Sequence, residues 1–265
     1  MNIIEAVILG IVQGITEFLP VSSSGHLQIV KALMDVELEE NVAFDLALHA
    51  GTVCSTILVL WPEIVKIFKG VFSRTFNQEQ AYVLKIALSM IPVAIVGFTL
   101  EDSLNVMLSS RGILIIVGTM LLITAILLAY ASFAKPRAKA NISFVDSFII
   151  GVAQAVAVMP GISRSGATIA TGLILGNKKE SVAQFSFLMV LVPILGKAFL
   201  SVVGGDPVWN SVGALPMISG FLASFVVGAF ACRFMINIIK RGKLVWFAYY
   251  CLVAALFSYV LYFFK

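Results

Sequence analysis

Long apolar stretches separated by short polar connections run through almost the whole chain. Six of them are long enough to cross a bilayer as a helix, which takes roughly 20 residues. They occupy residues 41–61, 83–100, 112–134, 182–203, 212–238 and 244–264. The stretches are continuous and lack the alternation of apolar and polar residues that a membrane β-barrel requires. The pattern therefore predicts six transmembrane helices.

Two further apolar regions, 3–34 and 144–176, are each interrupted in the middle by a polar loop rich in Ser and Gly. The first loop reads Pro20-Val-Ser-Ser-Ser-Gly25, and the second reads Pro160-Gly-Ile-Ser-Arg-Ser-Gly166. Each half of such a region is too short to span a bilayer comfortably. We predict two re-entrant helix–loop–helix hairpins, whose loops must be covered by protein or line a water-filled cavity.

The composition agrees with this pattern and excludes a soluble globular domain. Hydrophobic residues make up 60% of the 265 residues and charged residues 12%, and the mean hydropathy is +1.03, far above the soluble range. Cys54, Cys232 and Cys251 all lie in apolar stretches, which indicates free thiols rather than disulfides or a metal cluster. We expect an all-α polytopic membrane protein.

The charges of the connections predict the orientation. If six segments cross, one side of the membrane receives most of the basic residues, namely Lys66, Lys69, Arg74, Lys85, Lys135, Arg137, Lys139, Lys178, Lys179, Lys240, Arg241 and Lys243. The positive-inside rule places that side in the cytoplasm, so both termini face outward. The net charge of +4 reflects this bias, and no nucleic-acid partner is expected.

The two polar loops resemble each other at a constant spacing of 141 residues. Identical residues at that spacing are Gly10 and Gly151, Gln13 and Gln154, Ser22 and Ser163, Ser24 and Ser165, and Gly25 and Gly166. One hairpin enters from outside and the other from inside, and three spans follow each. The prediction is one membrane domain, residues 1–265, made of two inverted repeats, 1–134 and 135–265, with a site near the midplane where the broken helices meet.

The first loop carries a set of groups suited to a phosphorylated ligand. Gln13 and Glu17 are four residues apart and share one helix face. Pro20 ends that helix, and the serines at 22–24 are good N-caps for the next one. The free amides of a helix N-terminus bind anions. A histidine in the first turn, His26, is held neutral there and is able to accept a proton or attack phosphorus.

The second loop repeats this arrangement with different side chains. Gly161 follows the helix-breaking proline, and Ser163 and Ser165 can cap the next helix or bind an oxyanion. Arg164 offers a planar fork of donors that matches phosphate oxygens. Thr168 lies three residues after Ser165 and faces the same way. The two loops together hold a carboxylate, an imidazole, a guanidinium and several hydroxyls.

Simpler interpretations exist for each group. Glu17 and Arg164 can pair with each other merely to lock the hairpins together, and the three serines can be no more than a cap. His26 alone can be an interior histidine with satisfied hydrogen bonds. Asp45 and His49, four residues apart at the start of a span, form a second pair, for which a structural or entrance role is favoured.

At these residues the chain resembles the undecaprenyl-diphosphate phosphatase family of bacterial membrane enzymes, the bacitracin-resistance type. The first family motif corresponds to Gln13-Gly-Ile-Thr-Glu17 and continues as Phe18-Leu-Pro-Val-Ser-Ser-Ser-Gly-His26; the second is intact as Pro160-Gly-Ile-Ser-Arg-Ser-Gly-Ala-Thr168. Gln13 stands where a glutamate is common, and a neutral amide is a weak metal ligand and no base. The acid and metal role therefore falls on Glu17.

The resemblance implies six spans with two re-entrant hairpins, in the bacterial plasma membrane, with the site opening to the outer face. It implies removal of the terminal phosphate of undecaprenyl diphosphate, which recycles the lipid carrier of cell-wall synthesis and confers bacitracin resistance. The expected partners are the polyprenyl diphosphate lipid and the bilayer, and a homodimer is left open. The resemblance also implies dependence on a divalent cation.

The mechanistic hypothesis is metal-assisted phosphoryl transfer with Glu17, Ser23, His26 and Arg164 as catalytic residues. Substrate-binding roles are expected for Gln13, Ser22, Ser24, Gly25, Gly161, Ser163, Ser165 and Thr168. Arg164 and the helix N-termini hold the diphosphate, and Mg²⁺ or Ca²⁺ bridges it to Glu17. Ser23 activated by His26, His26 itself, and water activated by His26 are three alternatives for the nucleophile.

A transporter or lipid flippase is the main alternative function, because inverted repeats with broken helices are a transporter architecture. A non-catalytic scaffold is disfavoured, because it leaves Glu17, His26 and Arg164 without a role. Release of phosphate from a polyprenyl diphosphate distinguishes the enzyme from the transporter.

Overall fold

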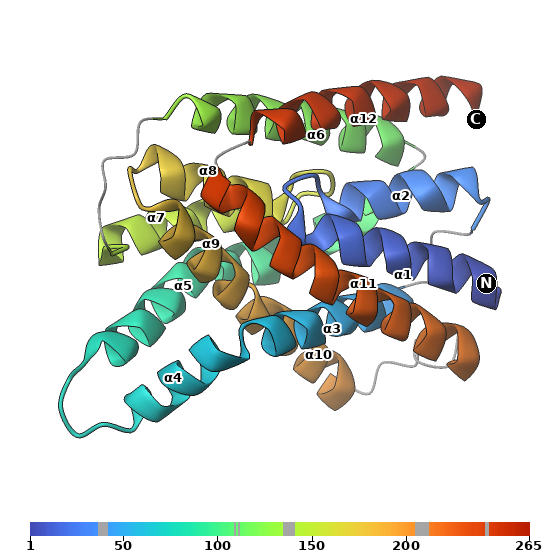
Figure 1. Cartoon of the computed structure of the whole chain (residues 1–265). Coiled ribbons are helices and arrows are strands. Elements are labelled where there is room, and N and C mark those ends of the chain that lie inside the picture. The colour runs from blue at the N-terminus through green and yellow to red at the C-terminus, as the bar shows by residue number, and fades with distance from the viewer. Residues whose placement is uncertain (37–41, 109, 111, 135–140, 205–211, 242–243) are drawn as a thin grey trace.

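All regular elements of the computed structural model are α-helices (Figure 1). It describes residues 1–36, 42–108, 110, 112–134, 141–204, 212–241 and 244–265. Five helical segments there are long and apolar enough to cross a membrane, namely Gln78–Leu100, Ile113–Ser132, Lys179–Lys197, Ala214–Ile239 and Val245–Phe264. A sixth is added if a bent pair of helices counts as one span. The all-helical class with several membrane spans is confirmed.

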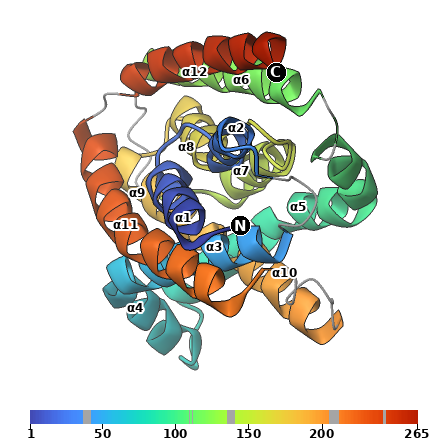
Figure 2. The same cartoon turned by 90° about the vertical axis from the view of Figure 1, so that its right-hand side faces the viewer.

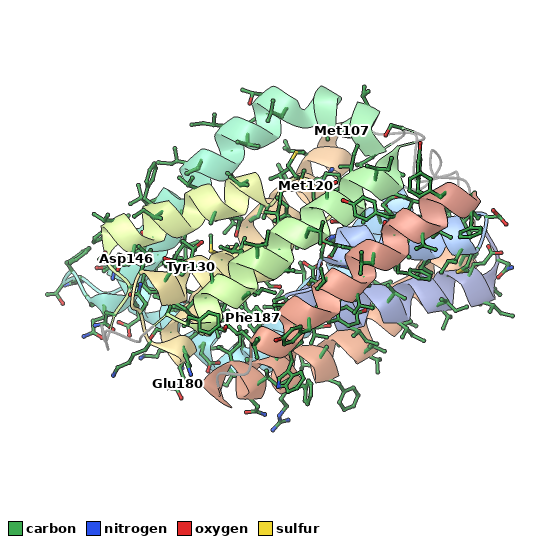
Figure 3. All side chains as sticks on the ribbon, turned by 90° about the horizontal axis from the view of Figure 1, so that it is seen from above. Met107, Met120, Tyr130, Asp146, Glu180 and Phe187 are labelled. Atoms are coloured by element: carbon green, nitrogen blue, oxygen red, sulfur yellow. The ribbon has the colours of Figure 1, made fainter. Side chains whose placement is uncertain are left out.

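Large apolar side chains point outward from the helices (Figure 3). Tyr130 is 65% exposed, and Phe98, Phe230 and Phe264 are exposed to a still greater fraction. Such a surface is unfavourable in water and is matched by lipid tails. The three cysteines are free, as predicted.

The predicted segment 41–61 ends where a second helix begins at an angle, and the predicted segment 182–203 contains a one-residue break; the apolar pattern indicated neither feature. α3 (Val42–Val59) and α4 (Trp61–Val71) are separated by one residue and bent by 77°. α9 (Lys179–Met189) and α10 (Leu191–Gly204) are also separated by one residue. Pro62 and Pro193 lie in the first turns of α4 and α10. Proline has no amide hydrogen and is tolerated at a helix start, so a new helix begins at each break.

Two hairpins occupy the middle of the molecule (Figure 2). The first consists of α1 (Ile3–Phe18) and α2 (Ser23–Leu33), and the second of α7 (Phe144–Val156) and α8 (Arg164–Ile174). The longer helices around them are α5 (Gln78–Leu108), α6 (Ile113–Ser132), α11 (Ala214–Arg241) and α12 (Val245–Phe264). Protein thus covers the non-helical loops, as a polar backbone inside a membrane requires. Their helix–loop–helix form is as predicted.

The hairpins match in their capping as well as in their sequence. Each first helix begins with a capping box, formed by Asn2 with Glu5 in α1 and by Ser143 with Asp146 in α7. Each second helix begins with a serine whose hydroxyl accepts from the amide three residues later. The spacing between equivalent caps is the same 141 residues. The repeated sequence therefore specifies a repeated local structure.

Each hairpin packs through a glycine against a long helix of the other half of the chain. α1 lies along α11, and α7 lies along α5. A Cβ atom on Gly10 would be 2.5 Å from the carbonyl oxygen of Gly220, and one on Gly151 would collide with the carbonyl of Ser89. These close approaches seat the hairpins firmly and fix the positions of the loops that follow.

We expect Gly151→Ala to destabilise the protein by about 1–3 kcal/mol, the usual cost of overpacking. The new methyl group would displace α7 from α5, because the obstacle is backbone and cannot rotate away. Thermal unfolding in detergent measures the effect. Gly97→Ala is the matched control, since nothing lies within 4 Å of a Cβ atom there. Equal melting temperatures for the two variants would contradict the packing argument.

Candidate active site

The two loop tips contact each other and α6. The amide of Gly161 donates to Ser24 Oγ over 3.4 Å, and Ser165 Oγ donates to the carbonyl of Leu19 over 3.1 Å. The amide of Ser163 donates to Thr124 Oγ1 of α6 over 3.1 Å. These hydrogen bonds link the two hairpins to each other and to α6, so the broken helices meet, as predicted.

Both turns use backbone with positive φ. Gly161 has φ of 100°, which glycine adopts without strain, whereas Ser22 has φ of 72°. A non-glycine residue held in this region costs free energy and is found mainly where the surrounding structure demands it. Ser22 is the N-cap of α2, accepts from the amide of Gly25 and is buried. The strained turn therefore sets the direction of Ser23 at the start of α2.

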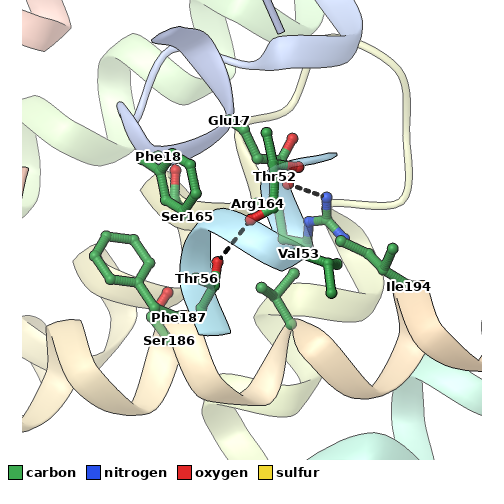
Figure 4. A pocket seen from close by; sticks show the side chains of 11 residues that line it. Glu17, Phe18, Thr52, Val53, Thr56, Arg164, Ser165, Ser186, Phe187 and Ile194 are labelled. Atoms are coloured by element: carbon green, nitrogen blue, oxygen red, sulfur yellow. Dashed lines mark hydrogen bonds and ion pairs between the residues drawn. The ribbon is translucent and has the colours of Figure 1, made fainter. Parts of the chain in front are cut away.

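The carboxylate of Glu17 is the centre of a polar cluster, and Figure 4 shows its pairing with Arg164. Its Oε1 accepts from Arg164 Nη2 at 2.5 Å. Its Oε2 accepts from Ser23 Oγ at 2.6 Å and from Gln13 Nε2 at 3.0 Å. Glu17 is only 7% exposed, so these donors replace the water that the buried charge has lost.

Local sequence explains why these side chains meet. Gln13 and Glu17 lie one turn apart on α1, as the four-residue spacing predicted. Glu17 is in the last turn of α1, where the helix dipole disfavours a carboxylate. Arg164 is the first residue of α8 and brings a cation to that position from the other hairpin. The charge pair is thus built by the two repeats together.

A pocket opens beside this ion pair (Figure 4). It is lined by Glu17, Phe18, Thr52, Val53, Thr56, Arg164, Ser165, Ser186, Phe187, Val190 and Ile194. The polar groups come from the hairpins, from α3 and from α9, while aromatic and aliphatic side chains form the remaining wall. Such a lining suits a ligand with a charged head and an apolar tail.

His49 is a residue that sequence reasoning assigned to a structural or entrance role but that lies beside the site. Its Nε2 is 3.8 Å from Glu17 Oε2, and its Nδ1 donates to the carbonyl of Asp45 at 2.7 Å. Asp45 itself pairs with the buried Lys31 at 2.7 Å. The spacing of four residues was the available signal, because it directs Asp45 and His49 along one face of α3.

His26 and Ser23, a pair considered from sequence, each have other hydrogen-bond partners. Its Nδ1 is 2.8 Å from the carbonyl oxygen of Ser22, and its Nε2 is 2.9 Å from the hydroxyl of Tyr250 on α12. The hydroxyl of Ser23 is directed to Glu17 instead. Nothing in the sequence indicated Tyr250, because α12 is a uniformly apolar span far along the chain.

The remaining predicted ligand-binding residues cap helices and join segments. Ser163 accepts from the amide of Gly166 and lies 3.3 Å from Ser165 in Oγ–Oγ distance. Thr168 donates to the carbonyl of Arg164 and lies 2.6 Å from Ser186 in Oγ–Oγ distance. These contacts fix the backbone around Arg164 and show that the serines act at least as caps, as predicted.

The donor set limits what cation the site can hold. Within the described part of the chain, no three His, Cys, Asp or Glu side chains converge. Glu17 is the one carboxylate at the pocket, with His49 as a neighbouring nitrogen donor. Mg²⁺ is commonly held by one or two carboxylates together with substrate phosphates. The residues fit a cation that arrives with a diphosphate better than a permanently bound one.

Similar proteins are known over nearly the whole length of the chain. The chain matches the family model described as bacitracin resistance protein BacA over residues 6–257. It is 56% identical over 259 residues to a protein of Parabacteroides distasonis named undecaprenyl-diphosphatase, with 97% of each chain covered. Proteins of the same name from Bacteroides thetaiotaomicron and Carboxydothermus hydrogenoformans are 54% and 38% identical, with 97% and 94% of each chain covered.

Proposed function

This chain belongs to the bacitracin resistance protein BacA family, and from that premise we propose that it is a membrane phosphatase that hydrolyses undecaprenyl diphosphate to undecaprenyl phosphate and inorganic phosphate. The observation that carries the proposal is the ion pair between Glu17 and Arg164, made by two separate hairpins at a pocket with an apolar wall. The product is the carrier lipid that cell-wall synthesis reuses, which connects the reaction with bacitracin resistance.

The pocket has a polar part and an apolar part, which match the diphosphate and the lipid tail of such a substrate. Arg164 presents a planar fork of N–H donors that can hold diphosphate oxygens and the charge that spreads over them during phosphoryl transfer. Thr52 and Ser186 add hydroxyls to the polar lining. Phe187, Val190 and Ile194 line the apolar part, where the first isoprenyl units can lie before the tail passes into the bilayer.

Ser23 is the nucleophile that the geometry favours. Its hydroxyl already donates to Glu17 at 2.6 Å, the arrangement of a nucleophile with its base. In the proposed step, Ser23 Oγ forms a bond to the terminal phosphorus, Glu17 takes the hydroxyl proton, and undecaprenyl phosphate leaves with the bridging oxygen. Water then cleaves the phosphoserine, and inorganic phosphate is released. His26 contributes to proton transfer from its position at the start of α2.

The family resemblance adds a divalent cation, Mg²⁺ or Ca²⁺, for which Glu17 would be the carboxylate ligand. When bound, Mg²⁺ or Ca²⁺ neutralises part of the diphosphate charge. Arg164 and the hydroxyl of Ser23 keep their roles as donors to Glu17 until the substrate enters.

The proposed topology has six spans, the two hairpins as re-entrant segments, and inverted repeats at 1–134 and 135–265. It is supported by the packing of each hairpin against the other half of the chain, since α1 lies along α11 and α7 lies along α5. The two chain ends lie at the same edge of the molecule (Figure 1), as an even number of crossings requires. By the positive-inside rule that edge is the outer face of the plasma membrane, to which we expect the site to open.

Phosphate release from purified protein tests the proposal. Incubation in detergent with a polyprenyl diphosphate is expected to yield one inorganic phosphate per lipid, and a chelator that removes divalent cations is expected to stop the reaction. Restoring Mg²⁺ or Ca²⁺ after removal of the chelator should restore the rate. Folded protein that releases no phosphate under any of these conditions would refute the enzyme assignment.

A lipid flippase is the second candidate, because packing of each broken hairpin against the other half of the chain is also a transporter arrangement. Proteoliposomes distinguish the two functions. Movement of a labelled polyprenyl phosphate between leaflets by a variant with no phosphatase activity would show that transport is a separate function of this fold. Movement that is absent in every variant would leave the phosphatase as the single function.

A further inference from the structure

His26 and Tyr250 form a pair that joins the first hairpin to α12. The Nε2 of His26 is 2.9 Å from the Tyr250 hydroxyl, and the planes of the two rings are nearly parallel, with an interplanar angle of 11°. His26 is buried, whereas the Tyr250 ring is half exposed on α12. The next residue, Cys251, contacts the carbonyl of Pro20 through its sulfur. This part of α12 is therefore seated on the loop that carries the site.

Hydrogen-bond chemistry determines the protonation of the imidazole. The carbonyl oxygen of Ser22 can only accept, so Nδ1 of His26, 2.8 Å away, carries the hydrogen. In the neutral ring, Nε2 then has a lone pair, and the Tyr250 hydroxyl donates to it. If Nε2 gains a proton, the same hydroxyl rotates and accepts. Tyr250 can therefore hold the ring in one orientation in both protonation states.

We propose that Tyr250 is a positioning residue of the phosphatase reaction, and that its hydroxyl fixes the orientation of the His26 imidazole through its contact with Nε2. This inference rests on the proposed function and on the role of His26 in it. Tyr250 acts through His26, because its hydroxyl is the group that faces the second ring nitrogen. Glu17 and Ser23 make their contacts without it.

Tyr250→Phe tests the proposal with the ring and its packing retained. We expect kcat to fall roughly 10- to 100-fold, a part of what a general acid or base contributes, with KM changed less than about threefold. The profile of kcat against pH should change shape, because the group that holds His26 in both protonation states is lost. Tyr249→Phe is the matched control, since Tyr249 is 60% exposed on the same helix, and its activity should equal that of the wild type.

Two further measurements separate positioning from a general structural effect. The chain has two histidines, so nitrogen NMR spectra of the full-length protein, assigned with His49→Gln, report the tautomer of His26. The wild type should carry hydrogen on Nδ1, as the Ser22 carbonyl requires. Tyr250→Phe should keep this tautomer but show a shifted Nε2 resonance, because Nε2 loses its hydrogen bond to the Tyr250 hydroxyl. An unchanged His26 spectrum in Tyr250→Phe would overturn the positioning role, whatever the activity.

A double-mutant cycle distinguishes failure of this inference from failure of the proposed function. In a His26→Gln background, Tyr250→Phe should cost no further activity, because the residue through which Tyr250 acts is already absent. Full additivity of the two losses would overturn the inference and leave the phosphatase intact. If His26→Gln alone has normal activity, the proposed role of His26 is wrong, and the inference fails with it.

Discussion

Arg164→Ala is expected to lower kcat/KM for the diphosphate lipid by at least about 10³-fold, in the range seen when an arginine that stabilises phosphoryl transfer is removed. Arg164 lies at the pocket and begins the helix that carries the second loop. Its guanidinium is the one that pairs with Glu17, so its loss removes both the phosphate fork and the partner of the carboxylate. Phosphate release by the purified variant measures the effect.

The effect of Arg164→Ala on stability must be separated from its effect on catalysis. Without Arg164 the buried carboxylate of Glu17 loses its counter-ion, which costs about 3–5 kcal/mol in a buried pair. Arg164→Lys provides the control, because it keeps the charge and removes the planar fork. We expect Arg164→Lys to melt close to the wild type and still to lose at least about tenfold in activity. Near-normal turnover by either variant would contradict the assignment of Arg164 to the site.

Apolar length predicted the helices well but their breaks poorly. The six stretches and two interrupted regions correspond to helices in the structure, since burial and lipid exposure both select continuous apolar residues. The bend between α3 and α4 was not predicted, because Pro62 lies at the end of the apolar run and marks a helix start as readily as a boundary. The direction that α4 takes after the bend depends on its packing against α5, and a local sequence pattern cannot predict that packing.

The residues of the candidate site were also only partly predictable from sequence. Glu17 and Arg164, which are 147 residues apart in sequence, were both predicted as site residues, and the structure brings them into contact. That contact was one of the interpretations weighed from sequence, as a lock between hairpins. The direction of His26 and the approach of His49 were not predictable, because each depends on a helix, α12 or α3, whose rotation is set by tertiary packing. Tyr250 could be found only in three dimensions.

Glu17→Gln is expected to lower kcat by at least about 10³-fold, since it removes the base for Ser23 and the carboxylate proposed to hold the cation. The amide is nearly isosteric and can still accept from Ser23 or Gln13 through its oxygen, so the polar cluster should keep its shape. It cannot take a proton from the serine, and its NH₂ group repels the donors of Arg164 where the carboxylate accepted them. Single-turnover phosphate release, with divalent cation varied, measures both effects.

Glu5→Gln is the matched control, because it makes the same chemical change on the same helix. Glu5 closes the capping box of α1, a position that glutamine also fills, and its activity and melting temperature should stay close to the wild type. Glu17→Gln should release no phosphate within a single wild-type turnover time at any Mg²⁺ or Ca²⁺ concentration, because the base is absent even when the cation is in excess. Recovery of the wild-type rate at high cation would limit Glu17 to metal binding. A normal rate at ordinary cation levels would reduce its pair with Arg164 to a link between the hairpins.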